Sequence, residues 1–199
     1  MSPAMSSYIN SLVEPKYLSS GIVIFNGEII FGQDTQSIID KIYKNSISKI
    51  GKSPNNLYKY GAENVIESAE LIKLVNEIFP FVIEYFGFEP TKKLLLYADF
   101  SVHYGKHMDT KLEEHKDDSD ITVNICLRNN LDSSIIRFSR SVDTIFSKSG
   151  LKQTFINFKP NQIISHLDYQ LHEVLLLDKD DQDKTDGHRV NLILWFKIT

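Results

Sequence analysis

The order of two hydrophobic periodicities is what most constrains the fold of this 199-residue chain. The first half has helical periods. Residues 34–47, DTQSIIDKIYKNSI, place Ile38, Ile39 and Ile42 on one face behind a capping Asp34 or Thr35, and a longer amphipathic helix is predicted from Ala62 to Phe86, with Pro80 as a bend or break. The second half changes to strand-like runs. Helices followed by strands do not alternate as a parallel sheet requires, so we expect an antiparallel sandwich or barrel that the helices buttress.

The strand-like runs are short, rich in β-branched and aromatic residues, and separated by turn formers. They are KLLLYADFSVHYG, DITVNICLRN, SSIIRFSR, QTFINFK, QIISHL, QLHEVLLL and HRVNLILWFKI. Upstream, Gly21 to Phe31 alternates around Asn26-Gly27 and predicts a hairpin of two short strands. The turn-rich residues 51–60, GKSPNNLYKY, predict a loop that can reach over a pocket. We therefore expect one domain, residues 1–199, with supporting elements in 1–93 and the β core in 94–199.

The net charge bears on the partners to expect, and the cysteine content on the cellular compartment. A net charge of -4 provides no attraction for a phosphate backbone, so nucleic acid is not expected as a partner. The lone Cys126 cannot form an internal disulfide, and no segment has the signature of a signal sequence or a membrane span. We expect a cytoplasmic protein in a reducing compartment, without a membrane partner. The oligomeric state is left open, because the apolar face of the helix from Ala62 to Phe86 suits either the core or a dimer.

Candidate metal ligands occur at a suggestive spacing. In EEHKDDSDITVNICL, His115 and Asp117 are two residues apart at the expected entry to a strand, so both side chains can approach one cation. A further histidine on a neighbouring strand would complete a facial triad of two histidines and a carboxylate, which leaves iron(II) positions open. Both His166 and His172 qualify on position. Arg189 enters the last strand, where its guanidinium can bind a carboxylate in a bidentate manner.

The runs HKDDSDITVNICL, QLHEVLLL and GHRVNLILW resemble the iron(II)- and 2-oxoglutarate-dependent dioxygenases, in particular the prolyl and lysyl hydroxylase branch. The resemblance covers the chain from Leu94 to its end. It implies a mainly β fold with flanking helices (α+β), a cupin-like double-stranded β-helix or jelly roll buttressed by N-terminal helices. It also implies hydroxylation of an unactivated C–H bond of an amino-acid side chain, in a prolyl or lysyl residue or a free amino acid, coupled to decarboxylation of 2-oxoglutarate to succinate.

The same resemblance assigns the site residues. It places Fe(II) on His115, Asp117 and His172, with His166 second to His172, and the distal carboxylate of the cosubstrate 2-oxoglutarate on Arg189. The catalytic set is thus His115, Asp117, His172 and Arg189, and the further cosubstrate-binding residues are Tyr104, Thr122 and Asn124. Dioxygen and an amino-acid or peptide substrate are the implied partners, with ascorbate as a stimulant. A non-catalytic β-helix binding module that has lost turnover is the alternative.

Three departures from the family pattern fall in loops. Arg189 follows His172 at a longer spacing than usual, which a solvated hairpin insertion at the acidic segment Asp178 to Gly187 would explain. Ser133 and Ser134 stand where a Gly-Gly pair is usual. Asn161 replaces a turn glycine, and asparagine also tolerates left-handed backbone geometry. None of these positions is a predicted ligand, so we expect altered loops and a retained activity.

Overall fold

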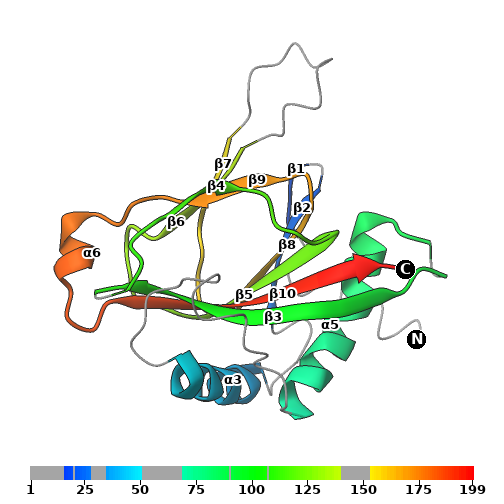
Figure 1. The fold of residues 1–199 in the computed structure, drawn as a ribbon, viewed down its shortest axis with the longest axis horizontal. Coiled ribbons are helices and arrows are strands. Elements are labelled where there is room, and N and C mark those ends of the chain that lie inside the picture. The colour runs from blue at the N-terminus through cyan, green and yellow to red at the C-terminus, as the bar shows by residue number, and fades with distance from the viewer. Residues whose placement is uncertain are drawn as a thin grey trace.

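Two antiparallel sheets face each other in the computed structural model, and two helices cover the outer side of the larger sheet (Figure 1). The structure describes residues 16–19, 21–27, 35–50, 69–89, 91–106, 108–139 and 153–199. This arrangement confirms the predicted helix-buttressed sandwich. No helix within these ranges combines the length and the apolar character needed to cross a lipid bilayer.

The larger sheet contains six strands and spans most of the chain. Their order across the sheet is β1 (Lys16–Ser19), β2 (Ile22–Asn26), β8 (Gln162–Leu167), β5 (Ile121–Asn129), β10 (His188–Ile198) and β3 (Leu94–Gly105). The pairing of β2 with β8 joins the first 93 residues to the predicted β core. The predicted turn at Asn26-Gly27 does not join β2 to its partners, which are β1 and β8. The second strand of that predicted hairpin falls on residues 28–31, outside the described residues.

The smaller sheet contains four strands, in the order β4 (Leu112–His115), β9 (Leu171–Val174), β6 (Ile135–Ser139) and β7 (Thr154–Asn157). All seven strand-like runs therefore form strands, β3 and β5 to β10. The strands β1 and β4 were not predicted. The sequence of β4, LEEH, has no apolar alternation, because this edge strand has three exposed residues and one half-buried residue.

The segment between the last two strands differs from expectation. β9 pairs with β4 and β6, whereas β10 pairs with β3 and β5 in the other sheet, so the two strands do not form the predicted hairpin. The acidic connection is also not a simple solvated loop. It contains a short helix, α6 (Lys179–Asp183), whose Asp181 is buried. Asn161 does adopt the left-handed conformation expected of it, with φ 66°.

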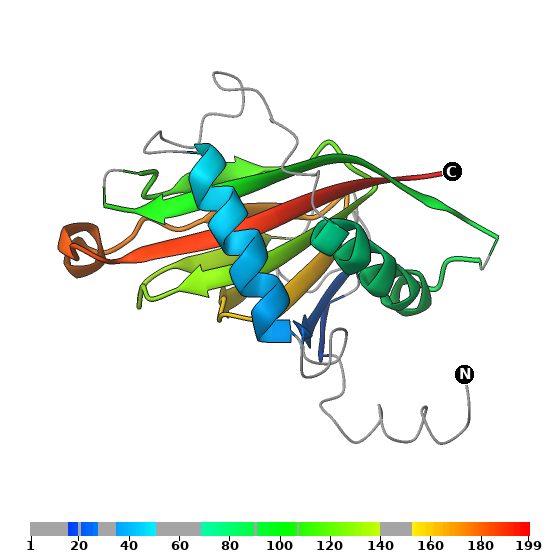
Figure 2. The ribbon, with the colours of Figure 1, turned by 90° about the horizontal axis from the view of Figure 1, so that it is seen from below.

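The helices α3 (Thr35–Ile50) and α5 (Ala69–Phe86) lie across the outer face of the large sheet (Figure 2). Ile38, Ile39 and Ile42 of α3 pack into a core with the sheet, as their spacing predicts. Pro80 does not break α5, which continues to Phe86. Proline removes one helical hydrogen bond, and the carbonyl that it frees is that of Asn76, an exposed residue that water can reach. The predicted helical residues 62–68 and the predicted loop 51–60 lie outside the described residues.

A second core fills the space between the two sheets. It consists of hydrophobic side chains from both sheets and their connections, among them Ile22, Phe100, Tyr104, Cys126, Phe138, Phe158, Ile164 and Val174. The helices thus stabilise one face of the large sheet and leave its other face to the smaller sheet. The space between the sheets is where the predicted site residues meet.

The packing of α5 gives a stability prediction. Leu74 is fully buried against the large sheet, whereas Ile72, two residues earlier, is 57% exposed. Leu74→Ala should lower the free energy of unfolding by about 2–5 kcal/mol, because it removes buried apolar area and leaves a cavity. Ile72→Ala, the matched control, should leave it close to the wild-type value. Urea unfolding followed by circular dichroism measures both, and equal shifts for the two variants would contradict this packing.

Candidate metal and cosubstrate site

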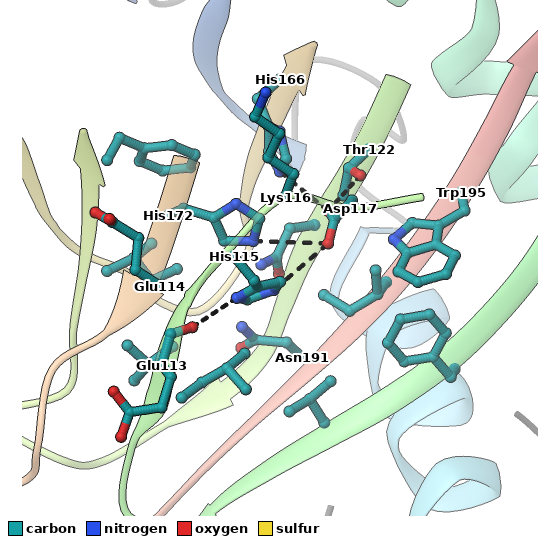
Figure 3. Close-up of a pocket in the computed structure, with 18 of the residues that line it drawn as sticks. Glu113, Glu114, His115, Lys116, Asp117, Thr122, His166, His172, Asn191 and Trp195 are labelled. Atoms are coloured by element: carbon teal, nitrogen blue, oxygen red, sulfur yellow. Dashed lines mark hydrogen bonds and ion pairs between the residues drawn. The ribbon is translucent and has the colours of Figure 1, made fainter. Parts of the chain in front are cut away.

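Three predicted ligands converge between the sheets (Figure 3). His115 is the last residue of β4, and its partner across the β4–β9 pair is His172, so their rings lie 4.3 Å apart. Asp117 lies in the turn between β4 and β5. One ligand atom from each of these residues lies within 4.8 Å of the others. The expectation that His115 and Asp117 share one strand is wrong, since β4 ends at His115 and the turn brings the carboxylate back towards the ring.

The ring nitrogens of the two histidines are oriented by backbone carbonyls. His115 Nδ1 lies 2.7 Å from the Glu113 carbonyl oxygen, and His172 Nδ1 lies 3.2 Å from that of Gln170. A carbonyl only accepts, so each Nδ1 carries the proton in the neutral ring and each Nε2 carries a lone pair. Both Nε2 atoms face Asp117 Oδ1, at 3.6 and 3.7 Å. The two Nε2 atoms and the carboxylate oxygen are three electron-pair donors that face a common space. A cation in that space would stabilise all three.

The electrostatics of the triad suit a cation. Burial lowers the pKa of His172 to about 3, so its imidazole is neutral near pH 7. Burial opposes ionisation of Asp117, but the contacts with His115, His172 and His166 and the hydrogen bond from Thr122 outweigh it and hold the pKa of this carboxyl well below its usual range. Burial also lowers the pKa of His115, but its contacts with Asp117 and the Glu113 carbonyl raise that pKa overall, so a proton competes with a metal there.

His166, the other candidate ligand, faces the other carboxylate oxygen of Asp117. Its Nε2 is 3.4 Å from Asp117 Oδ2, the oxygen that also accepts the hydrogen bond from Thr122 Oγ1 at 2.5 Å. His115 and His172 instead share Oδ1. The geometry therefore groups His172 with the predicted ligands and places His166 beside them, with its ring 4.7 Å from that of His172.

Arg189 lies deeper than the triad. It is fully buried at the start of β10, with its guanidinium carbon 4.5 Å from the centre of the Tyr104 ring. Its Nη1 donates to the Ser134 carbonyl at 3.2 Å, whereas Nε and Nη2 have no hydrogen-bond partner. Among the described residues, no carboxylate forms an ion pair with it. A buried cation with two free donors is costly, and an anion would satisfy both.

A cavity of about 390 Å³ extends from the triad into the space between the sheets. Tyr104, Thr122 and Asn124, the other predicted cosubstrate residues, line it. Arg189 is not among the lining residues, but its guanidinium contacts the ring of Tyr104, which is one of them. Most of the remaining wall is apolar: Phe100, Val102, Leu112, Ile136, Phe138, Val174, Ile193 and Trp195. Burial also raises the pKa of Tyr104 to about 12, so the phenol stays protonated.

Two polar wall residues escaped the sequence prediction. Asn191 is 2% exposed and its Oδ1 has no hydrogen-bond partner, and the Trp195 Nε1 is also unpaired. Both lie on β10 at even spacing from Arg189, so they share its face of the strand. That period-two alternation is a signal that could have identified them.

Comparison with known proteins supports a 2-oxoglutarate- and iron-dependent oxygenase. No family model matches the chain. Two Arabidopsis thaliana proteins do: the "2-oxoglutarate and iron-dependent oxygenase domain-containing protein CP2", 28% identical over 71% of this chain, and the similarly named ICU11, 31% identical over 48%. The matches cover only 36% and 23% of those proteins. The family that these names describe implies Fe(II) and 2-oxoglutarate as cofactor and cosubstrate.

Solved structures with similar folds confirm the double-stranded β-helix. A 2OG-Fe(II) oxygenase family protein from Burkholderia pseudomallei has a TM-score of 0.60 at 14% identity, covering 96% of this chain and 89% of its own. A Pseudomonas putida prolyl-4-hydroxylase has a TM-score of 0.54 at 11% identity, and the match covers 98% of this chain and 95% of the hydroxylase. The carbocyclase SnoK from nogalamycin biosynthesis has a TM-score of 0.61 at 11% identity, and the match covers 98% of this chain and 83% of SnoK. Because these neighbours differ in reaction, the prolyl and lysyl hydroxylase branch is not confirmed.

Proposed function

We propose that this chain is an Fe(II)- and 2-oxoglutarate-dependent dioxygenase that hydroxylates a C–H bond of an amino-acid side chain. The observation that carries the proposal is that one ligand atom each of His115, His172 and Asp117 lies within 4.8 Å of the others, with both Nε2 atoms facing Asp117 Oδ1. Two neutral imidazoles and one carboxylate are the donor set of non-haem iron(II) oxygenases, and three ligands leave coordination positions free for other molecules. The donor set therefore fits the metal that the relatives' names imply.

Within this proposal, His115, Asp117 and His172 hold the iron, which supplies oxidation by dioxygen coupled to the conversion of 2-oxoglutarate to succinate. The carbonyls of Glu113 and Gln170 keep each Nε2 unprotonated and hold the rings in place. Thr122 donates to the second oxygen of Asp117 and so fixes the orientation of the carboxylate.

The other residues act on the cosubstrate and substrate. The two unpaired donors of Arg189 match the two oxygens of a distal carboxylate, and the proton of the Tyr104 phenol and the amide of Asn124 provide further polar contacts. The apolar wall excludes water and suits the aliphatic part of a side chain such as prolyl or lysyl, in a peptide or as a free amino acid. The lone, buried Cys126 supports a cytoplasmic site of action, where thiols stay reduced. The net charge of -4 argues against a nucleic-acid substrate.

Succinate formation tests the proposal. Anaerobically purified protein, given Fe(II), 2-oxoglutarate, ascorbate and air, should form succinate even without a substrate, at a slow rate. His172→Ala should abolish this turnover, because it removes one of the three ligands. His188→Ala removes a histidine outside the cavity, which bonds to Tyr43 of α3, and should retain the turnover.

The opposite result supports the second candidate. If the wild type forms no succinate and calorimetry detects no 2-oxoglutarate binding, the oxygenase proposal fails, and a β-helix module that binds ligands without turnover becomes the better description. Free amino acids and short peptides are then screened for binding instead of for stimulated turnover.

A further inference from the structure

The acidic segment between β9 and β10 contains one carboxylate that does not behave like its neighbours. Asp178 caps α6, and Asp178 and Asp180 are exposed, but Asp181 is only 2% exposed. Burying a carboxylate is costly unless hydrogen bonds replace its water. The partners of Asp181 therefore show what the segment is built to hold.

Those partners belong to the turn between β5 and β6. Asp181 Oδ2 accepts from the Ser133 backbone N–H at 2.6 Å and from Ser133 Oγ at 2.7 Å. The Asp178 backbone N–H in turn donates to Ser133 Oγ at 2.9 Å, and Lys184 Nζ donates to the Asn130 carbonyl at 2.7 Å. Burial raises the pKa of Asp181, but the hydrogen bonds from Ser133 outweigh it and lower the pKa overall. Together with the hydrogen bond from Asn130 Nδ2 to the Asp186 carbonyl, these contacts tie this turn to the acidic segment.

The residue that follows Ser133 contacts the buried arginine. The Ser134 carbonyl accepts from Arg189 Nη1 at 3.2 Å, and Ser134 is fully buried. The ring face of Tyr104 supports the guanidinium but does not fix its rotation, because a cation–π contact is weakly directional. The direction in which Nε and Nη2 point therefore depends on where the Ser134 carbonyl lies.

We infer that Asp181 is a positioning residue that, through Ser133, holds the Ser134 carbonyl in place and so aims the free donors of Arg189 at the distal carboxylate of the cosubstrate. This inference rests on the proposed function. It gives the acidic segment a role in cosubstrate affinity, although the segment touches neither the cavity nor the triad.

Calorimetry on the full chain loaded with Mn(II), a metal inert to air under these conditions, tests the inference with two anions. 2-Oxoglutarate has a distal carboxylate, whereas oxalate, which chelates metals through adjacent oxygens, has none. Asp181→Ala should weaken 2-oxoglutarate binding about tenfold, as loss of supporting contacts around a site usually does, and leave Mn(II) and oxalate affinities unchanged. Asp181→Asn should bind nearly as the wild type does, since its amide oxygen can accept both Ser133 hydrogen bonds. Asp180→Ala, the exposed neighbour, is the control.

The outcomes separate the two proposals. If Asp181→Ala binds 2-oxoglutarate as tightly as the wild type, or loses oxalate in equal measure, the positioning role is wrong and the oxygenase proposal stands. If the wild type itself binds no 2-oxoglutarate, the proposed function fails and the positioning role fails with it. Should Asp181→Ala not fold, Ser133→Ala keeps one of the two hydrogen bonds to Asp181 and should show a smaller loss that is again confined to 2-oxoglutarate.

Discussion

The Asp117→Ala variant should lose at least about 100-fold in iron(II) affinity, more than the loss of a supporting contact usually costs. Asp117 supplies the one carboxylate of the triad, and its negative charge offsets that of the cation in a buried site. Without it, two neutral imidazoles remain, which bind a divalent ion far more weakly. Anaerobic calorimetry with Fe(II) measures the loss directly, and succinate formation should disappear with it.

One further variant separates the charge of the Asp117 carboxylate from its position, and a second variant is the control. Asp117→Asn keeps the size of the side chain and an oxygen for the Thr122 hydrogen bond, so it should bind iron less well than the wild type and better than the alanine variant. Asp168→Ala removes an exposed carboxylate outside the cavity and should have wild-type affinity. Iron binding that survives in Asp117→Ala would mean that the metal site does not include this residue.

The sequence predicted those strands in which apolar residues recur at the spacing of a sheet. It did not predict the two short edge strands β1 and β4. The runs from β3 and β5 to β10 have apolar residues at the spacing of a sheet packed on one or both faces. β4 has only one apolar residue, and the two apolar residues of β1 (KYLS) are adjacent, so neither strand has a detectable period. The assignment of β9 and β10 to different sheets depends on pairing between distant strands, which local periodicity does not encode.

The site divides in the same way. Residue types and spacing selected His115 and Asp117 and left His166 and His172 open, and the family resemblance then favoured His172. Neither could describe how the three meet, because a strand pair and a turn, not one alternating strand, bring them together. Their roles as ligands stay a prediction. The burial of Asp181 was not predictable, since its partner Ser133 lies 48 residues earlier in the chain and an acidic run ordinarily faces solvent.

Replacement of the buried Arg189 guanidinium should have two opposite effects. It should weaken the binding of 2-oxoglutarate and should not lower the stability of the ligand-free protein. Arg189→Met should weaken 2-oxoglutarate binding by about 30-fold or more, since removing one partner of a buried charge pair costs about 2–5 kcal/mol. In the metal-free protein without cosubstrate, the same variant should be at least as stable as the wild type. The wild-type charge is fully buried, has two unpaired donors and gains only the Tyr104 ring and one carbonyl.

Urea unfolding with and without ligands measures both effects. With Mn(II) present and 2-oxoglutarate at 100 times the wild-type dissociation constant, the wild type should gain about 2.7 kcal/mol of stability, whereas Arg189→Met should gain less than about 1 kcal/mol from the same concentration. Arg128→Met is the matched control, because the Arg128 guanidinium also lies over a tyrosine ring, that of Tyr43 at 5.0 Å, but its side chain is exposed. That variant should keep wild-type binding. If Arg189→Met instead unfolds at much lower urea, the guanidinium serves to hold the two sheets together. If the variant keeps the wild-type affinity for 2-oxoglutarate, other residues bind the cosubstrate carboxylate.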